Sequence, residues 1–572
     1  RCEKIIAFVM TLKPKILKNK YGILGGFFLL LLISTLVYQR HQNTGYFNWR
    51  SKMWSDPVGY YVYLPGLFIY GFDGTKFPEN IVEKTGEGFI IDENGKIIVR
   101  YTCGIAILQA PVFLAIHAFA GLKGLEQDGF SGVYHLVSSF SAIIYAFFGL
   151  ILLWHFLRFY YKMRIVFLTM LTIFFGTNLL YYTIDSTGMP HIYSFFLFAL
   201  LLVLSHHYFS KEKDKNKYIF PIALVSALIV LIRPTNLLFV GLVFLLDIKS
   251  FDDLLLRIRR VFNLPNIAVL LITFFIVFLP QMIYWKYSSG SFIIDSYEGY
   301  GFTNWTSPRI KEFLFSTNNG MFPYNPLYFL IIFGLILMMF KRELNGFLIF
   351  SLFAGLIYIF SSWFVFSFGC GFGSRNFVEY TAILAIPLGF FYSDFLGKSV
   401  AKWIVAIPVI LALVFVNAKL TYSYNKCFID GDWDWVEYKY LLKARKFNKT
   451  YTYSPALSLN DKMEFSESIH IDMSKIAKVN FRRAILKTKV RIYEKDNDAS
   501  IVFQITTPDT LLYWNGEAIA QQFYEDELGE YKTVKADFWL PRYYTVNSEI
   551  SSFIWNVGKD SLDVKNIKIH LE

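Results

Sequence analysis

The chain has 572 residues, of which 55% are hydrophobic and 19% aromatic, and its mean hydropathy is +0.40. These values exclude an ordinary water-soluble globular enzyme. The apolar residues form long runs rather than an alternating pattern, which disfavours a transmembrane β-barrel. The net charge of +12 is typical of basic residues beside a membrane and gives only weak support for nucleic-acid binding. Composition therefore predicts a helical membrane protein with several spans.

The first apolar run covers residues 21–38 and follows five lysines, which predicts a cytoplasmic N-terminus. The apolar stretch 103–121 is either a span or a helix on the membrane surface. We expect a surface or re-entrant helix, because later basic loops then fall on the inner side. Together with the first run this predicts eleven spans and an external C-terminus. The further spans are expected at 133–157, 165–182, 190–209, 218–231, 236–247, 265–285, 327–340, 345–362, 376–396 and 403–421.

From about residue 425 the density of apolar residues falls, and period-two stretches appear at 487–493, 500–505 and 565–571. They predict a soluble β-rich domain, most simply a β-sandwich outside the membrane. We therefore expect a transmembrane domain over 1–424, with a large first outer loop at 40–132, and a periplasmic β-rich domain over 425–572. The four cysteines show no metal-binding spacing and no disulfide framework, and we expect at most one incidental disulfide.

Asp56 lies in the aromatic segment Trp54-Ser55-Asp56-Pro57-Val58-Gly59-Tyr60-Tyr61, soon after the first apolar run. This position places its carboxylate near the outer membrane surface. A partly desolvated carboxylate can act as a general base toward a hydroxyl, although an Asp before Pro is also typical of a turn. Both interpretations stay open for this segment taken alone. If Asp56 is a general base, Tyr60 and Tyr61 are candidate substrate contacts.

Asp185 and His191 follow between two expected spans, at the same depth as Asp56. We expect the two acids and the imidazole to converge as catalytic groups. The alternative is that Asp185 caps a helix and that His191 is an interfacial residue with a backbone partner. Their spacing matches no local metal-binding motif.

Arg233 and Pro234 interrupt an apolar stretch of about thirty residues, which is too long for one span and too short for two full ones. Breaks of this kind at membrane depth usually line a cavity. Arg233 is therefore either a substrate-binding residue that faces a cavity or an arginine that snorkels to the membrane surface.

The outer loop at 286–326 mixes aromatic residues with polar ones, among them Glu298 and Arg309. This mixture suits sugar binding and suits an interfacial aromatic belt equally well. Glu298 and Arg309 are accordingly candidate substrate contacts, and both interpretations of the loop stay open.

A glycine-rich turn precedes the expected span at 376–396, in the sequence Phe368-Gly369-Cys370-Gly371-Phe372-Gly373-Ser374-Arg375-Asn376-Phe377-Val378-Glu379-Tyr380. Exposed backbone N–H groups and a guanidinium form an anion site, and a lipid phosphate lies at this depth. The alternative is that Arg375 pairs with Glu379 one helical turn later. We predict that Arg375 binds phosphate and that Glu379 belongs to the same site.

These features together resemble the GT-C superfamily of polytopic glycosyltransferases. The resemblance covers residues 20–420 and is strongest to bacterial members related to protein mannosyltransferases and the aminoarabinose transferase. The stretch 373–380 and the segment Pro190-His191-Ile192-Tyr193-Ser194-Phe195 look like segments of Bacteroidetes-type members. The resemblance implies a GT-C fold of about eleven transmembrane helices, here with an extracytoplasmic β-sandwich-like domain, in a bacterial inner membrane.

In that family the donor is a sugar on a polyprenyl phosphate, and transfer to a hydroxyl of a glycan, lipid or protein inverts the anomeric centre. The resemblance implies that Asp56 is the base and that Arg375, with Arg309 or Arg233, neutralises the leaving phosphate. Many relatives have two adjacent acids in the first loop. Here Asp56 precedes Pro57, so Asp185 is the expected partner acid. Some relatives bind a divalent ion near the acids, but this sequence provides no clear ligand set.

Two other function classes remain open from the sequence. Broken helices and cavity arginines are also expected in a transporter or flippase of lipid-linked glycans. The odd number of expected spans and the lack of an inverted repeat weaken that alternative. The second class is a non-catalytic membrane scaffold subunit that retains the acids for structure.

Overall fold

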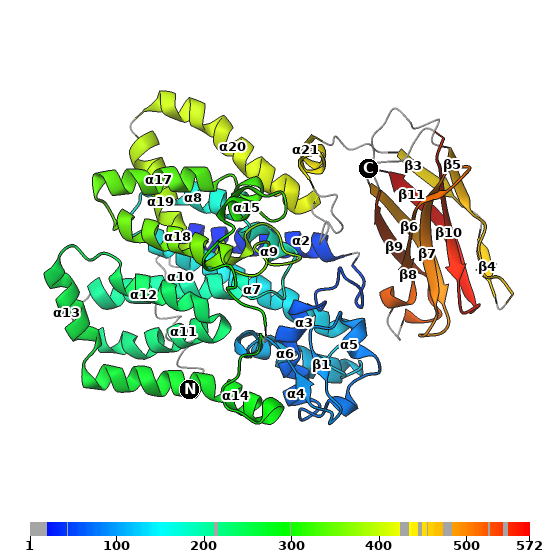
Figure 1. Ribbon diagram of the computed structural model, residues 1–572, viewed down its shortest axis with the longest axis horizontal. Helices are drawn as coiled ribbons and strands as arrows, with labels where there is room; N and C mark the ends of the chain where they lie inside the picture. Colours follow the sequence, from blue (N-terminus) through cyan, green and yellow to red (C-terminus); the bar gives the residue numbers. More distant parts are fainter. Residues whose placement is uncertain are drawn as a thin grey trace. The chain divides into compact units, whose positions relative to one another are not determined.

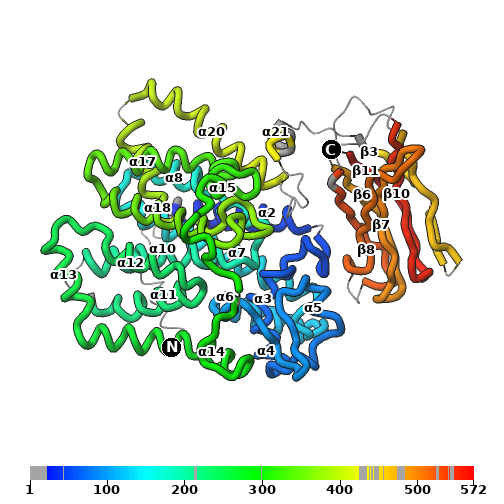
Figure 2. The backbone as a smooth tube through the Cα atoms, in the orientation of Figure 1, coloured from blue at the N-terminus to red at the C-terminus, as the bar shows by residue number. Residues whose placement is uncertain are grey.

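The computed structural model describes residues 20–571 apart from 43, 211–214, 298, 398, 424–433, 444–448, 455, 461, 473–482, 524–526 and 541–546. The chain forms two compact units (Figures 1 and 2). We call them the helical unit (1–40, 55–82 and 88–442) and the β unit (41–54, 83–87 and 443–572). Two segments of the expected first outer loop thus belong to the β unit by their contacts.

Six helices in the described part of the chain are long and apolar enough to cross a membrane. They are α2 (Lys20–His41), α6 (Gly104–Lys123), α7 (His135–Leu157), α10 (His191–Ser210), α14 (Leu264–Ser289) and α20 (Val400–Ser423). Shorter apolar helices accompany them: α8 (Met163–Gly176), α11 (Ile219–Ile232), α12 (Leu237–Leu245), α17 (Tyr328–Lys341), α18 (Gly346–Ser361) and α19 (Thr381–Phe390). The chain is therefore a multi-pass membrane protein, and the number of eleven spans stays a prediction.

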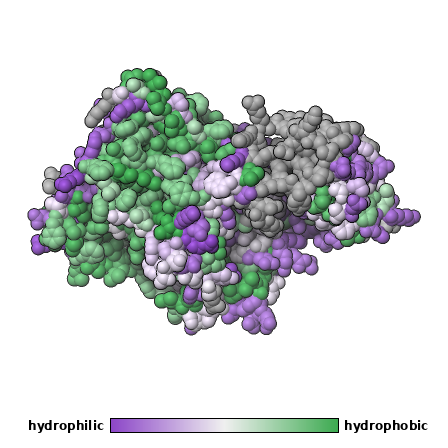
Figure 3. Space-filling view, turned by 45° about the horizontal axis from the view of Figure 1, so that its top comes forward, coloured by the Kyte–Doolittle hydropathy of each residue, from purple (hydrophilic) through white to green (hydrophobic). Residues whose placement is uncertain are grey.

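Packing between helices explains which apolar faces are buried. Helix α7 packs on α10, α11 packs on α14, and α17 packs on α19 (Figure 1). Apolar side chains on other faces stay exposed, for example Phe27 on α2 (60% exposed), Leu271 on α14 (67%) and Leu411 on α20 (62%). Figure 3 shows hydrophobic residues over much of the visible face of the helical unit. Such a surface is stable where lipid replaces water.

Short elements connect the long helices. They are α3 (Asp56–Tyr61), α4 (Tyr63–Phe68), α5 (Ile81–Lys84), β1 (Ile90–Ile91), β2 (Ile97–Ile98), α9 (Leu179–Ile184), α13 (Phe251–Val261), α15 (Ile310–Phe315), α16 (Met321–Tyr324) and the 3-10 turns η5 (Pro234–Asn236) and η6 (Arg375–Phe377). Helix α6 was expected on the membrane surface, and it has the length and composition of a span. The break between α11 and α12 lies where Pro234 lacks an N–H for helix continuation.

The β unit contains two antiparallel sheets, with strand orders β5-β10-β7-β8 and β3-β11-β6-β9, and β4 also pairs with β11. The strands are β3 (Lys449–Tyr453), β4 (Leu457–Leu459), β5 (Ile469–Asp472), β6 (Arg483–Ile492), β7 (Ala499–Thr506), β8 (Leu511–Ala518), β9 (Lys532–Trp539), β10 (Glu549–Asn556) and β11 (Leu562–Leu571). Side chains from both sheets share one hydrophobic core, including Phe503, Phe538 and Ile569. This confirms the prediction of a C-terminal β-sheet domain, including the strands expected near 487–493, 500–505 and 565–571.

The first-loop segment of the β unit is held by Arg50. One of its terminal nitrogens donates to the carbonyl oxygen of Asp537 at 3.1 Å, and the guanidinium also pairs with the carboxylates of Asp537 (3.5 Å) and Glu517 (3.8 Å). Nearby, the backbone N–H of Phe47 donates to the carbonyl of Gln521. Residues 41–54 are therefore part of the β unit by charge pairing as well as by backbone hydrogen bonds.

Candidate active site

Asp56 is the first residue of α3, and the backbone around it is tightly constrained. The preceding residue, Ser55, has a φ of 56°, a conformation that a non-glycine residue keeps only where its surroundings enforce it. The carbonyl of Ser55 accepts hydrogen bonds from the N–H groups of Val58 and Gly59. A Cβ on Gly88 would lie 2.1 Å from that carbonyl oxygen. The close approach of Gly88 therefore fixes the start of α3 and the position of Asp56.

The carboxylate of Asp56 has two partners. The Tyr101 hydroxyl donates to Oδ1 at 2.5 Å, and Nη1 of Arg375 donates to Oδ2 at 3.4 Å. The side chain of Asp56 remains 29% exposed, so it is both held and accessible. The ring of Tyr60 lies against that of Tyr101, with centroids 4.4 Å apart. Burial, and then the charge of Asp56, raise the pKa of Tyr101 far above its ordinary value, so Tyr101 stays a hydrogen-bond donor.

Arg375 lies in η6, directly after the glycine-rich turn. Its Cδ would be 3.0 Å from a Cβ on Gly371, and a Cβ on Gly373, which has a φ of 59°, would meet the side chains of Tyr324 and Asn325. The φ of Gly373 favours glycine there, and a side chain at Gly371 would crowd Arg375 and the Tyr182 hydroxyl. The Nε atom of Arg375 is buried and has no hydrogen-bond partner among the described residues. Buried donors are rarely left unsatisfied, so this nitrogen points to a missing acceptor.

Arg233 forms the second cationic part of the site. Its Nη1 donates to Oε1 of Glu379 at 3.0 Å and its Nη2 to Oδ1 of Asn376 at 2.7 Å. The other carboxylate oxygen of Glu379 lies 3.0 Å from Nδ1 of His191, and both of these side chains are fully buried. Glu379 therefore joins Arg233 to His191. The alternative expectation was a pair between Glu379 and Arg375. The structure does not show this pair, because residues 375–377 form a 3-10 turn rather than α-helix.

Aromatic residues surround the two arginines and Asp56. Tyr60 is 6% exposed and interacts electrostatically with Asp56, Arg233 and Arg375. Tyr297 from the outer loop interacts with the same three charges. Asp56, Arg233, Arg375 and Tyr60, which come from three separate predicted site segments, are thus brought together.

Other predicted site residues have different surroundings. Asp185 forms an ion pair with Arg40 at the end of α2, and its side chain is 8% exposed. Its partnership with Asp56 stays a prediction. The Tyr61 hydroxyl donates to the carbonyl of Gly129 at 2.6 Å, which is a buried structural contact. Arg309 pairs with Glu312 on its own turn at 3.3 Å and is 48% exposed.

Glu298 lies outside the described residues. His191 is fully buried against Glu379 rather than exposed toward a substrate. This contact holds the carboxylate of Glu379 in place. The role of His191 in catalysis stays untested.

Two residues that contact this site were not anticipated from the sequence. Tyr101 binds Asp56, and the Tyr182 hydroxyl accepts the backbone N–H of Phe372 at 3.0 Å in the glycine-rich turn. No sequence pattern near either residue marks it as part of a site, because each is one of 38 tyrosines and its partner is far away in the sequence. Only the tertiary structure identifies them.

The residues around Asp56 do not fit a divalent metal ion. Its charged neighbour is the guanidinium of Arg375, and a metal ion would have to compete with that cation. The described part of the chain contains no group of three or more His, Cys, Asp or Glu side chains able to hold a metal ion.

Comparisons with known proteins give a limited likeness. No protein-family model matches the chain, and a search of curated proteins finds no match. Among solved structures, the chain is similar to the oligosaccharyltransferase of Archaeoglobus fulgidus in complex with an inhibitory peptide and a dolichol-phosphate, at 14% identity and a TM-score of 0.40. It is also similar to that enzyme tethered to an acceptor peptide, at 12% identity and a TM-score of 0.42. The alignments cover 73% and 71% of this chain, and 57% and 55% of those chains.

Proposed function

We propose that the protein is an inverting glycosyltransferase that moves a sugar from a polyprenyl-phosphate donor to a hydroxyl acceptor at the outer face of the cytoplasmic membrane. One observation carries the proposal: Asp56 and Arg375 are in contact, and the guanidinium keeps a buried nitrogen without a partner. A base and an anion-binding group must lie within about one sugar of each other for such a transfer. This pair meets that requirement.

The phosphate side of the reaction is assigned to Arg375, supported by Arg233. A phosphate between them would satisfy Nε of Arg375 and replace Asp56 as the partner of Nη1. Guanidinium groups bind phosphate oxygens in pairs of parallel hydrogen bonds, which makes arginine well suited to this role. Arg233 keeps its orientation through Glu379 and Asn376. Its charge therefore remains aimed at the site when the phosphate enters.

The acceptor side is assigned to Asp56. The acceptor hydroxyl oxygen attacks the anomeric carbon, the bond from that carbon to the phosphate oxygen breaks, and its electron pair leaves with the phosphate. The hydroxyl proton passes to Asp56, and the configuration at the anomeric carbon is inverted. Tyr101 orients the carboxylate through its hydrogen bond to Oδ1. A positioned base of this kind contributes about 10²–10⁴-fold to the rate, and the arginines stabilise the charge on the departing phosphate.

Two features support the outer face of the membrane. If 103–121 does not cross the membrane, as expected from the sequence, the short inner loops carry most of the basic residues, which favours an outer position for the loops that contain Asp56 and Arg375. Cys370, in the same turn as Arg375, is disulfide-bonded. Disulfides persist in oxidising compartments outside the cytoplasm.

The test compares envelope glycans and glycolipids by mass spectrometry in cells that carry the wild type, a deletion, Asp56→Asn or Arg375→Lys. We expect the same single sugar to be missing in the deletion and in both variants. The Arg375→Lys substitution keeps the charge but removes the paired donors. Asp252→Asn, which alters an exposed carboxylate in the first turn of α13, is the matched control and should leave the glycans unchanged.

Membrane abundance and thermal stability of each variant show whether it has folded. Wild-type glycans in cells with a folded Asp56→Asn variant, but altered glycans in the deletion, would refute the transferase and favour transport or a scaffold role. Unchanged glycans in all strains would refute the proposal for the organism's major glycans. The purified protein would then be assayed directly with polyprenyl-phosphate sugars. Absence of transfer in that assay would refute the proposal as a whole.

A further inference from the structure

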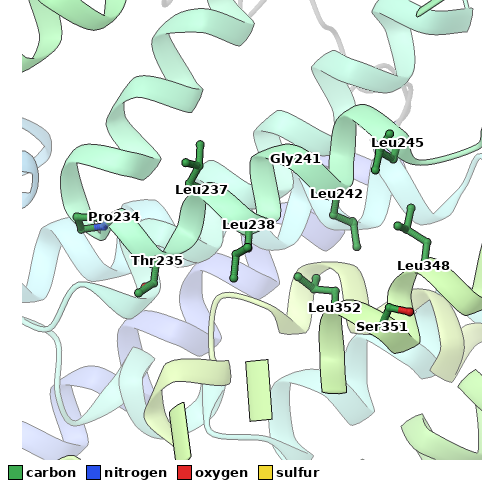
Figure 4. Close-up of a pocket in the computed structure, with 10 residues that line it drawn as sticks. All are labelled: Pro234, Thr235, Leu237, Leu238, Gly241, Leu242, Leu245, Leu348, Ser351 and Leu352. Atoms are coloured by element: carbon green, nitrogen blue, oxygen red, sulfur yellow. The ribbon is translucent and has the colours of Figure 1, made fainter. Parts of the chain in front are cut away.

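Two features outside the candidate active site differ in how much they say about a partner. An apolar groove between α12 and α18 is lined by leucines such as Leu238, Leu242 and Leu352 (Figure 4), and none of its lining residues is charged. The described residues do not identify an occupant for it. One face of the sheet β3-β11-β6-β9 in the β unit is strongly basic instead, so it specifies the charge of a partner.

Five lysines lie on the face of this sheet that points away from the hydrophobic core. Residues two apart on a strand share a face, and the alternate residues of β6 point into the core. In one cross-strand row, Lys487 on β6 lies directly opposite Lys568 on β11 and Lys535 on β9. In the next row, Lys489 lies opposite Lys565. We call this surface, made of the five lysines on three neighbouring strands, the lysine face.

The rows on either side of the lysine face show how this sheet usually holds a cation. Arg491 lies opposite Asp563, and its Nε donates to Oδ2 of that carboxylate at 2.9 Å. Toward the other end of β6, Arg483 donates two hydrogen bonds to the carboxylate of Asp537. None of the five lysines forms an ion pair with a carboxylate of the described residues. The sheet therefore neutralises its cations at both ends and leaves those between them unneutralised.

This arrangement carries a cost while no anion is bound. Like charges directly opposite each other on a sheet are destabilising, and Lys487 has a lysine on both neighbouring strands, each about 4.8 Å away. Burial lowers the pKa of Lys535 to about 8; Asp537 opposes this shift, whereas nearby cations, Lys487 among them, add to it. Lys535 therefore still carries its charge at pH 7. A bound anion would relieve the repulsion.

We propose that the lysine face binds an acidic glycan, a sugar chain with repeated carboxylate or phosphate groups. The charge is spread over three strands and two rows, so a chain with several acidic groups neutralises it better than one small anion does. Thr452 and Thr533 continue the two rows, are exposed, and offer hydrogen bonds to sugar hydroxyls. The basic rows are only about 10 Å wide and are bounded by neutralised ones, which suits a single chain rather than a flat bilayer.

The choice of a glycan rests on the proposed function, because a glycosyltransferase at the outer face of the membrane works among sugar chains. The binding itself does not require Asp56, which belongs to the helical unit. Transfer and binding of the acidic chain can therefore be measured separately.

The test measures binding of sugar polymers to the full chain in an uncharged detergent by biolayer interferometry. The probes are polygalacturonate, which has a carboxylate on every sugar, and dextran, which is neutral. We expect the wild type to bind polygalacturonate but not dextran, and we expect this binding to weaken at high salt. Lys487→Gln combined with Lys568→Gln should weaken it by about tenfold or more.

Lys462→Gln combined with Lys559→Gln is the matched control. This variant removes two charges from exposed positions of the β unit that are not on the lysine face, and it should bind like the wild type. Lys489→Gln combined with Lys565→Gln alters the second row and should reproduce the loss, also if the first variant fails to fold. Both lysine-face variants should resist urea better than the wild type without polymer, because opposed like charges are removed.

The outcomes separate this inference from the proposed function. Absence of polygalacturonate binding by the wild type, or an equal loss in the control variant, would overturn the assignment of the lysine face. Binding of phosphatidylglycerol vesicles instead, by the full chain in a phosphatidylcholine nanodisc, would overturn it in favour of an anionic membrane if the lysine-face variants lose that binding. Asp56→Asn should bind polygalacturonate like the wild type. Retained polymer binding without any sugar transfer by the wild type would refute the proposed function alone.

Discussion

Arg375 and Asp56 are 319 positions apart in the sequence, yet Nη1 of Arg375 lies 3.4 Å from Oδ2 of Asp56. One residue precedes a short apolar helix in the C-terminal half of the helical unit, and the other begins a short helix just after the first long one. The proposed function gives this contact a consequence. If Arg375 binds the donor phosphate and Asp56 is the base, phosphate binding would weaken the ion pair and leave the carboxylate free for the acceptor hydroxyl.

The contact between Tyr101 and Asp56 predicts the effect of Tyr101→Phe. A hydrogen bond to a charged group contributes about 1.5–3 kcal/mol, so we expect sugar transfer to fall by about 10–100-fold with little change in folding. Because burial and Asp56 raise the pKa of Tyr101 above its ordinary value, its hydroxyl stays protonated, and the loss should be the same from pH 6 to pH 9. Transfer rates across this range check both the size of the loss and its independence of pH.

Tyr70→Phe is the control for Tyr101→Phe, since the Tyr70 hydroxyl donates to the carbonyl of Asp128 instead. A loss that disappears at one end of the pH range would contradict this role.

The close approach of Gly88 to Ser55 predicts the effect of Gly88→Ala. A methyl group there would lie 2.1 Å from the carbonyl oxygen of Ser55, so the backbone that carries Asp56 must move. We expect the rate of transfer to fall by about 100-fold while the protein still inserts in the membrane, since a displacement of about 1 Å costs that much. Gly301→Ala, at a glycine with open space around it, should be silent. Equal activity of the two variants would show that this approach does not position Asp56.

The buried contacts of Glu379 predict a large stability effect for Glu379→Gln. The substitution leaves Arg233 without its carboxylate partner beside the fully buried His191. Removing one member of a buried charge pair typically costs about 3–5 kcal/mol. We expect a clear fall in the melting temperature of the detergent-solubilised protein, measured by intrinsic fluorescence. Glu312→Gln, which alters an exposed pair with Arg309, should change it little. An unchanged melting temperature for Glu379→Gln would mean that the pair adds nothing to stability.

The charge cluster in the β unit predicts how its stability depends on pH. Burial by itself would raise the pKa of Asp537, but Arg483 and Arg50 lower it from 3.8 to about 2. The folded state therefore releases this proton more readily than the unfolded state. The resulting stabilisation, about 2 kcal/mol at 1.36 kcal/mol per pKa unit, is complete above pH 4 and is lost as the pH falls through 2.

Brief pepsin digestion in increasing urea between pH 2 and pH 5, with mass spectrometry of β6 and β9 peptides, measures this dependence in the full chain. Asp537→Asn should remove about 2 kcal/mol of the pH-dependent change. Asp509→Asn, in an exposed turn, should retain it. An identical pH profile for Asp537→Asn and the wild type would show that Asp537 is not the responsible group.

Composition and periodicity were sufficient to identify the class of protein. Long apolar runs must form helices in a membrane, because lipid cannot satisfy backbone hydrogen bonds. Alternation in the tail predicted strands that the structure places in β6, β7 and β11. Pro234 marked the break between α11 and α12, since proline acts on its own local backbone. These signals are local, so they can be read from the chain without knowledge of its partners.

The site itself could be predicted only in part. Asp56, Arg233 and Arg375 attracted attention because charges are costly near a membrane. The sequence could not show that Arg375 pairs with Asp56 rather than Glu379, or that Tyr101 binds Asp56. Asp185 had been expected beside Asp56, and the structure pairs it with Arg40. Pairings of this kind depend on how separate helices pack, and packing sums many weak contacts that no single segment contains. The sequence determined which groups are too polar to face lipid, and only the tertiary structure decided which of them meet.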